Sequence, residues 1–490
     1  MFWEEEFYDM FLRRWNQHDL RHVGDTMETL KLFTDCIEVL NMSGDEFCND
    51  NAKILLALRH VRRLIVRNLV PQAPSWDIMT RLVKENCHLS ELVFSEVKFS
   101  NSEFGSLCTM ITTTVEKALD ICRITTLDFV KVVIEPEGYR RLVALVGEMP
   151  QLIQLSLTSS STKFYNKLLV DAALRVPTLE RLFLINYFGD GAFNGLAELR
   201  KPLPLRYLGS GNINVSFKTL RAICRASMNV VLNLERLDLD SNTRINDPAI
   251  YTLAPMLASP VVGLATRLTH LDLSSCKFGL VGVTYLLLAL GQNNTVKHLN
   301  LADNRFGVGF GDVLANFLLV KSSIKDLNIF KVELELSGVS DALLTALESN
   351  LTLTSLSLGA NGLQDRGATT ILKALVKRAH LKPFKSIDLS SNGITVGGLK
   401  LIADIFDSIM SANVTHAHAA GRYGVDVSCT KRQRVEDSDN IHRPSSADIV
   451  LFKKLRLVYN NFNVIGEAGR ECELLLESIR RYVGHVKLNA

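Results

Sequence analysis

The sequence predicts an α/β solenoid of about 14 repeats, in which a parallel inner sheet is backed by outer helices. A pattern with apolar residues at i, i+3 and i+5, often with a small or amide residue at i+8, returns through the chain. Its clearest copy is Leu353, Leu356, Leu358 and Asn361. An amphipathic stretch separates successive copies. Self-similarity of this kind indicates a repeat architecture, in which each unit buries its apolar face against its neighbours.

Each part of the pattern has a mechanical reason. The residues at i+3 and i+5 flank a polar one, so a short strand points two side chains toward the core and the one between them outward. The residue at i+8 lies where the chain leaves the strand. A buried amide there can satisfy backbone groups of its own turn and of the neighbouring turn. We therefore expect a ladder of amides that includes Asn361, Asn392 and Asn460.

Relaxing the pattern slightly tiles the whole chain, and most copies lie 26 to 31 residues apart. The predicted strands begin at Ile37, Val61, Leu89, Ile124, Leu152, Leu179, Leu205, Leu234, Leu268, Val296, Ile324, Leu353, Phe384 and Phe452. The amphipathic stretches between them predict helices, including those at residues 283–290, 312–320, 341–347 and 368–377. The repeating unit is therefore strand, turn, helix, turn.

The repeats resemble the leucine-rich repeats of the ribonuclease-inhibitor subfamily over roughly residues 37 to 490. The match is specific from Leu234 to Ile394, where a Gly recurs six residues after the Asn or Cys position, as at Gly282 and Gly398. Strands spaced about 4.8 Å apart and helices that need about 10 Å force the stack to bend toward its strands. About 14 repeats would form a horseshoe, whose hollow could admit a helix, a hairpin or part of a globular domain.

Two segments fall outside the tiling. Residues 1–36 predict an N-terminal helical cap, because the first repeat of a solenoid otherwise exposes the edge of its core. A docking helix for a partner is the alternative for this aromatic-rich segment. Residues 37–490 form the predicted leucine-rich repeat domain, and residues 411–448 within it predict a disordered insertion of low hydrophobicity and mixed charge.

Composition excludes several classes of function. No apolar run is long enough to span a membrane, and the net charge of +3 argues against obligatory nucleic-acid binding. The acidic start, Met1 to Glu6, lacks the basic flank of a signal peptide and predicts a cytoplasmic protein, with a nuclear or cytoskeleton-associated location as the alternatives. The nine cysteines contain no CxxC pair, so neither a metal site nor a cofactor is predicted.

The residues between and beside the strand leucines should point into the hollow. In the middle of the arc they combine aromatic, basic, acidic and histidine side chains, a mixture typical of protein-binding surfaces. The predicted partner-binding residues are Arg181, Phe183, Tyr207, Arg236, Asp238, Asp240, His270, Asp272, His298 and Asn300.

Some of these residues have a simpler interpretation. An Asp between two strand leucines, as at Asp238 and Asp272, often only solvates the inner face of the sheet. His270 and His298 could lie about 5 Å apart with Asp272 nearby, which suits a metal or acid–base pair, but a solvated surface pair is simpler. Residues 306–312 imitate a phosphate-binding glycine loop, yet they fall where neighbouring repeats turn, and no Lys-Ser/Thr follows.

No Ser-His-Asp order, HExxH or paired-carboxylate motif is present, so we expect no enzymatic activity. The first hypothesis is an intracellular scaffold that holds a protein partner in the horseshoe and could belong to a larger complex. A second is a regulator of a small GTPase, because Ran GTPase-activating proteins are similar to this repeat type, although the acidic C-terminal tail of that family has no counterpart here. A third is a structural subunit of a cytoskeletal or axonemal assembly, because residues 3–15 are faintly similar to a segment of a nexin–dynein regulatory complex subunit.

Overall fold

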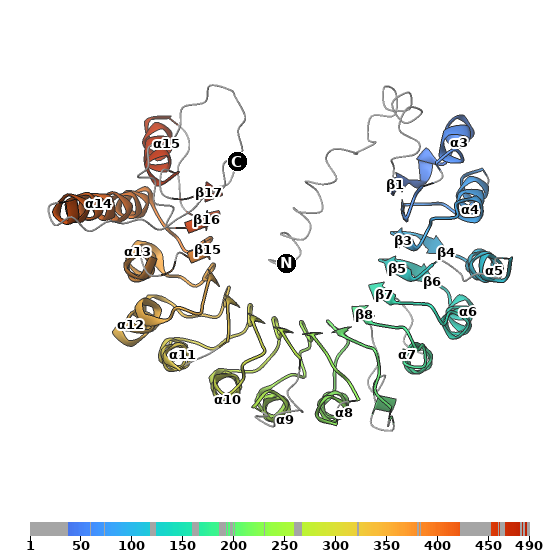
Figure 1. Cartoon of the computed structure of the whole chain (residues 1–490), viewed down its shortest axis with the longest axis horizontal. Helices are drawn as coiled ribbons and strands as arrows, with labels where there is room; N and C mark the ends of the chain where they lie inside the picture. The colour runs from blue at the N-terminus through green and yellow to red at the C-terminus, as the bar shows by residue number, and fades with distance from the viewer. Residues whose placement is uncertain are drawn as a thin grey trace. The chain divides into compact units, whose positions relative to one another are not determined.

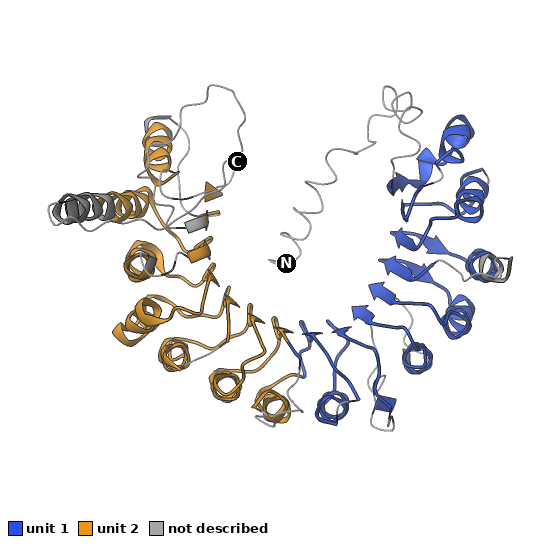
Figure 2. Cartoon of the chain, viewed as in Figure 1, with its two compact units in different colours: residues 1–244, 262–268 blue, residues 245–261, 269–490 orange. Residues whose placement is uncertain are grey.

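The computed structural model describes most of the chain between residues 38 and 487. Outside the described residues lie 1–37, 59, 73, 118–123, 159–165, 186–192, 194, 197–198, 200, 230, 259–266, 321–322, 380–381, 383, 422–451, 459, 461–465, 481–482, 484–485 and 488–490. The chain divides into two compact units (Figure 2). Unit 1 comprises residues 1–244 and 262–268, and unit 2 comprises residues 245–261 and 269–490. The predicted N-terminal cap, residues 1–36, lies outside the described residues.

Unit 1 is a parallel sheet backed by helices. Its strands, in spatial order, are β1 (Val39–Ser43), β2 (Arg63–Arg67), β3 (Glu91–Ser95), β5 (Thr126–Val130), β7 (Gln154–Thr158), β8 (Arg181–Ile185), β9 (Tyr207–Gly209) and β10 (Arg236–Asp238). The helices are α3 (Asn49–Leu55), α4 (Ser75–Glu85), α5 (Asn101–Lys117), α6 (Pro136–Gly147), α7 (Asn166–Ala173) and α8 (Phe217–Met228). Strands β4 (Lys98–Phe99) and β6 (Val133–Ile134) pair with each other in a second, two-stranded sheet.

Unit 2 repeats the same arrangement. Its strands are β11 (His270–Asp272), β12 (His298–Asn300), β13 (Asp326–Asn328), β14 (Ser355–Ser357), β15 (Phe384–Asp388), β16 (Phe452–Arg456) and β17 (Val486–Lys487). Its helices are α9 (Asp247–Ala258), α10 (Leu280–Gly291), α11 (Phe310–Leu319), α12 (Asp341–Ser349), α13 (Gln364–Ala379), α14 (Val396–Gly421) and α15 (Gly466–Arg480). In each unit the helices lie on one side of the sheet only (Figure 1).

The structure confirms the α/β solenoid with a parallel sheet and backing helices. All 14 predicted strands are present. Strands β15 and β16 begin at the predicted residue, whereas the others begin two residues later. From Val61 to Leu353, the first apolar residue of each repeat packs in the core before strand pairing starts. Strands β4, β6 and β17 were not predicted, since runs of two residues carry no periodicity. Helix α14 continues to Gly421, into the predicted insertion 411–448, so that residues 411–421 are helical. Residues 422–451 lie outside the described residues.

One row of strand side chains runs through the core of each unit. Parallel pairing places Leu64, Leu92, Leu127, Leu155 and Leu182 side by side in unit 1, each fully buried. In unit 2 the same row contains Leu271, Leu299, Leu327, Leu356 and Ile387. The residues on either side of this row point to the opposite face, because side chains alternate along a strand.

The predicted amide ladder is present in unit 2. The Nδ2 of Asn361 donates to the carbonyl oxygens of Ile329 and Leu358 at 2.8 and 3.0 Å. The backbone N–H of Asn361 donates to Oδ1 of Asn392 at 2.9 Å, and the N–H of Asn392 donates to Oδ1 of Asn460 at 2.9 Å. Each buried amide therefore satisfies backbone groups in its own turn and in the neighbouring turn.

Two of the recurring glycines make room for a carboxylate. A Cβ on Gly282 would collide with Oδ1 of Asp247, and one on Gly398 would collide with Oδ1 of Asp365. Asp247 accepts hydrogen bonds from the backbone N–H groups of Gly279 and Gly282 at 2.7 and 3.1 Å. An acidic side chain at the start of one helix thus binds the N-terminus of the next, where the helix dipole favours negative charge.

A row of non-glycine residues with positive φ follows the strands of unit 2. Ser275, Asp303, Lys331, Ala360 and Ser391 have φ between 52° and 55°. Each donates its backbone N–H to a carbonyl of the following repeat at 2.8–2.9 Å. This inter-repeat hydrogen bond offsets a conformation that costs about 1–3 kcal/mol for residues with a Cβ. The run 306–312 turns into helix α11, which begins at Phe310, with Gly307 at φ 77°.

Candidate binding surface

We call the side of each sheet that its helices leave uncovered the open face (Figure 1). All ten predicted partner-binding residues lie on the strands or strand exits of this face. Six of them belong to unit 1, namely Arg181, Phe183, Tyr207, Arg236, Asp238 and Asp240. The other four, His270, Asp272, His298 and Asn300, belong to unit 2. Along β8 the burial alternates as the pattern predicts, with Leu182 and Leu184 buried and the residues between and beside them half-buried.

The open face of unit 1 carries an aromatic cluster, defined here as Arg181, Phe183 and Tyr207. Parallel pairing sets Tyr207 beside Arg181, and Phe183 beside Gly209. The ring of Phe183 packs over Gly209, where a Cβ would approach the ring's Cδ1 to 2.5 Å. The missing side chain of Gly209 therefore lets the ring lie against the backbone. The result is a half-buried, well-held aromatic surface next to a guanidinium.

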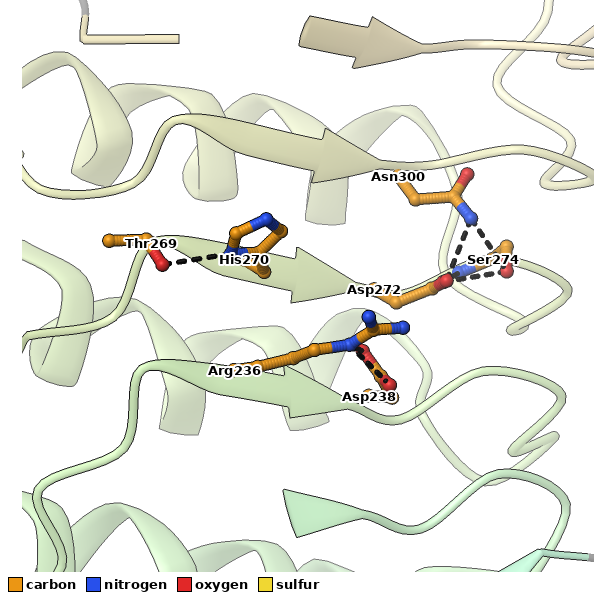
Figure 3. A network of polar contacts seen from close by, with 7 residues as sticks. All are labelled: Arg236, Asp238, Thr269, His270, Asp272, Ser274 and Asn300. Carbon is orange, nitrogen blue, oxygen red and sulfur yellow. Dashed lines mark hydrogen bonds and ion pairs between the residues drawn. The ribbon is translucent and has the colours of Figure 1, made fainter. Parts of the chain in front are cut away.

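The phenol of Tyr207 is anchored from the loop before β10. Its hydroxyl donates to Oε2 of Glu235 at 3.4 Å, and Nη1 of Arg206 donates to Oε1 of the same carboxylate at 3.3 Å. In β10, Nε of Arg236 donates to both carboxylate oxygens of Asp238, at 3.0 and 2.8 Å (Figure 3). These contacts fix side chains that would otherwise lose conformational freedom on binding a partner.

A buried carboxylate on this face was missed from the sequence. Asp128 is 8% exposed and accepts two hydrogen bonds from Nε2 of Gln154, at 2.9 and 3.1 Å. Burial raises the pKa of Asp128, although the hydrogen bond from Gln154 and the positive charges of Arg63 and Arg181 act in the opposite direction. Asp128 lies between two core residues of β5, at the register position that Asp238 occupies in β10. Extending the register to the earlier strands would therefore have found it.

In unit 2 the two predicted histidines do meet. His270 and His298 are paired across β11 and β12, and their rings stack with centroids 4.0 Å apart and planes 11° apart. The Nδ1 of His270 lies 2.8 Å from the hydroxyl of Thr269. The Nδ1 of His298 lies 2.7 Å from Oδ2 of Asp326. The carboxylate that contacts the pair is therefore Asp326, on the next strand, and not Asp272 as expected.

Burial acts to raise the pKa of Asp326. Hydrogen bonds from His298 and Ser355, together with the charges of His298 and Lys385, outweigh burial and hold the pKa below its ordinary value. Asp326 was missed because only the two histidines of this row were singled out. It occupies the same register position as they do.

Asp272 and Asn300 serve the turns that follow their strands. Oδ1 of Asp272 accepts from the backbone N–H of Ser274 at 2.9 Å, and Oδ1 of Asn300 accepts from that of Ala302 at 3.2 Å. The Nδ2 of Asn300 also donates to Oδ2 of Asp272 at 2.8 Å (Figure 3). These side chains therefore close turns in addition to solvating the inner face, and much of their hydrogen-bonding capacity is used internally.

The sequence comparisons agree with this repeat geometry. A family model described as "Leucine Rich repeat" matches residues 266–287, 292–308, 349–372 and 380–403, which coincide with the strands and helices of successive repeats. The chain is a leucine-rich repeat protein. Leucine-rich repeats generally mediate protein–protein interactions. The assignment to the ribonuclease-inhibitor subfamily stays a prediction.

This leucine-rich repeat protein is similar to parts of two longer proteins. It is 32% identical over 186 residues to the human "NACHT, LRR and PYD domains-containing protein 14", a match that covers 36% of this chain and 16% of that protein. It is 27% identical over 216 residues to the bovine "NACHT, LRR and PYD domains-containing protein 3", covering 42% of this chain and 20% of that protein. The matched region is thus a fifth or less of each relative.

Among solved structures, the TLR13–ssRNA13 complex aligns with 73% of this leucine-rich repeat protein and 50% of that chain, at 14% identity and a TM-score of 0.38. Within the described residues, no group of three or more His, Cys, Asp or Glu side chains is arranged to hold a metal ion. A search of the same residues finds no helix with the length and apolar character needed to cross a bilayer.

Proposed function

We propose that this protein is a non-enzymatic intracellular scaffold that binds a protein partner on the open face of unit 1. The aromatic cluster of Arg181, Phe183 and Tyr207 supports this proposal most strongly. Tyr and Arg are among the residue types over-represented at binding hot spots, and Phe is enriched at interfaces. All three side chains of the cluster are half-buried on a face that the unit's own helices leave uncovered.

The geometry of the cluster explains why it suits binding better than a solvated surface would. Phe183 is held against Gly209, and Tyr207 is tied to Glu235, so both rings are already ordered before a partner arrives. Ordered aromatic anchors lose little conformational entropy on association. In the same proposal, Arg236, Asp238 and Asp240 form the polar rim that excludes water.

The histidine-bearing residues of unit 2 have a lesser place in this proposal. His270, Asp272, His298 and Asn300 are engaged with one another or with neighbouring backbone. A partner that bound there would have to replace hydrogen bonds that already exist, and this limits the net gain. We propose that they contribute specificity and little affinity.

Affinity purification of a tagged chain from native cells tests the proposal. The double change Phe183→Ala with Tyr207→Ala should weaken capture of the bound protein by about thirtyfold, because truncating an aromatic anchor costs about 2 kcal/mol or more. The matched control is Phe217→Ala, which removes another exposed aromatic of unit 1, on the helical side at α8. Undiminished capture by a folded double variant would refute the proposal.

Two alternatives would give other results in the same experiment. A regulator of a small GTPase, like the Ran GTPase-activating proteins, should recover a GTPase and accelerate its hydrolysis of GTP. A structural subunit of a cytoskeletal or axonemal assembly should recover many proteins in fixed proportion and localise to that structure. A scaffold should recover its partner without changing any GTPase rate.

A further inference from the structure

Unit 2 exposes an apolar patch on the outer surface of its helices, on the side away from the open face. Val281, Tyr285 and Leu288 of α10 are 53%, 49% and 65% exposed. Tyr251 of α9 is 41% exposed and meets Tyr285 edge to face, with ring centroids 4.4 Å apart. Val320, which ends α11, is 50% exposed and lies close to the end of α10 at Gly291. We call these five residues the outer patch.

The outer patch differs from the rest of the helical layer in having no charge. Helix α10, with the sequence LVGVTYLLLALG, contains no acidic or basic residue. Helix α9 contains only Asp247, and this carboxylate binds the backbone at the start of α10. Helix α13 of the same unit, in contrast, carries five charged residues over 16 positions. A helix that packs one face on a core and exposes the other to water normally carries polar residues on the exposed face. The exposed face of α10 is apolar instead.

The spacing of the exposed residues suits packing against another helix. Val281, Tyr285 and Leu288 are separated by four and then three positions, the alternation that forms a single apolar seam along a helix. This seam is additional to the buried side of α10, which uses Val283, Leu286 and Leu290. Helix α10 therefore has one apolar face for its own core and a second that its own unit does not cover.

We propose that the outer patch is the dimer interface of this protein, with α10 packing against α10 of a second copy about a two-fold axis. In such an interface the same patch contributes from both sides, so an uncharged apolar seam is complementary to itself. An unlike partner would have no charge in the patch by which to be selected. The net charge of +3 over 490 residues gives little repulsion between copies.

The size of the patch agrees with a dimer. The five side chains of the outer patch each expose about half of their surface and together offer on the order of 500 Å² of apolar area. A stable interface buries about 800 Å² on each partner and has an apolar core surrounded by a polar rim. The patch therefore supplies the core, and neighbouring polar residues of α9, α11 and α12 supply the rim.

The test is sedimentation equilibrium of the full chain over a range of concentrations. The unmodified protein should dimerise, and Leu288→Lys should raise the dimer dissociation constant by about thirtyfold or more, because it places like charges in a desolvated core. Leu474→Lys on α15 is the matched control, since Leu474 is 68% exposed and lies outside the outer patch. It should leave the dissociation constant unchanged.

A mixture of two charge variants distinguishes a two-fold contact from other kinds of association. With the two-fold axis passing beside Leu288, the most exposed residue of the patch, Leu288→Lys and Leu288→Glu should each be monomeric alone. An equimolar mixture should form a heterodimer, because opposite charges then face each other across the axis. Circular dichroism verifies that both variants fold. A chain that stays monomeric at every concentration overturns the proposal, and so does a dimer that Leu288→Lys leaves intact. Failure of the mixture to associate would overturn the two-fold packing of α10.

Discussion

The open faces of the two units share one strand register but use its middle position differently. In unit 2 this position, which lies between two core residues, contains Ser357 and four acidic or amide residues. The four are Asp272, Asn300, Asn328 and Asp388. Each of these accepts a hydrogen bond from the backbone N–H two residues on. In the longer strands of unit 1 the same position contains Ile65, Val93, Asp128, Ser156 and Phe183. In its short strands β9 and β10 it contains Gly209 and Asp238.

Strand length explains the difference. Strands β2, β3, β5, β7 and β8 of unit 1 run two residues past the middle position, so the sheet itself pairs the backbone there. Strands β11 to β15 of unit 2 end at the middle position, and in all but β14 the side chain there accepts from the N–H two residues on. A longer strand thus frees the middle position for an aromatic such as Phe183. A shorter one commits it to the turn.

The largest expected effect is in the core row, which the two units share. Leu182→Ala in unit 1 and Leu356→Ala in unit 2 should each destabilise by about 2–5 kcal/mol, because both remove a buried side chain and leave a cavity. Leu182 is 0% and Leu356 is 3% exposed. Denaturant unfolding measures both. A loss in one unit only would show that the two cores are not equivalent.

The amide ladder, which includes Asn242 in unit 1 as well as the amides of unit 2, should have the next largest effect. Asn361→Leu should destabilise by about 1–3 kcal/mol, because backbone groups of two turns lose their partners. Phe183→Ala, at a half-buried position of unit 1, is the comparison and should cost clearly less. Thermal unfolding followed by circular dichroism measures both variants. Equal losses would mean that the open-face aromatic is as structural as the ladder.

A buried aspartate in each unit should make the free energy of unfolding depend on pH, and the two aspartates should act in opposite directions. The pKa of Asp326 is lowered in the folded state, so its ionised form stabilises unit 2 above the ordinary pKa of 3.8. That contribution is lost as the pH falls from 3.8 through the lowered folded-state value. Asp326→Asn should therefore cost about 1 kcal/mol at pH 7 and flatten the acid limb of the stability curve.

Ionisation of Asp128 should change the stability in the opposite direction. Its pKa is raised from 3.8 in the folded state, so the buried charge destabilises unit 1 at neutral pH, and protonation relieves this as the pH falls through the raised value. Asp128→Asn should leave the protein as stable or slightly more stable at pH 7. Unfolding free energies of both variants between pH 3 and pH 7 test the pair. A change of unfolding free energy in the same direction in both variants would contradict this prediction.

The smallest effect is expected from the predicted insertion. Replacing residues 422–446, which follow α14, by a short Gly-Ser linker should shift the melting temperature very little, because an insertion without core contacts contributes mainly loop entropy. Deletion from residue 411 onward also shortens α14 and provides the contrast. A large drop with the shorter deletion would mean that the insertion packs on unit 2.

Most of the fold could be predicted from the sequence, because burial in a repeat protein is encoded locally. The alternation at Leu356 and Leu358 identifies a strand and its core face, and Asn361 identifies the turn that follows. The turn at Ser275, Asp303 and Lys331 could not be predicted, because these residues have no intrinsic preference for positive φ and adopt it for an inter-repeat hydrogen bond.

For the candidate site, the sequence determined which residues reach the open face, since alternation fixes the direction of each side chain once the register is known. Only the tertiary structure decided what each side chain contacts there. His298 meets Asp326 instead of Asp272, and Phe183 lies on Gly209, because these contacts join residues about one repeat apart. The outer patch follows the same rule. The sequence of α10 shows that it is apolar all round, but only its packing on α9 and α11 decides that Tyr285 and Leu288 remain outside.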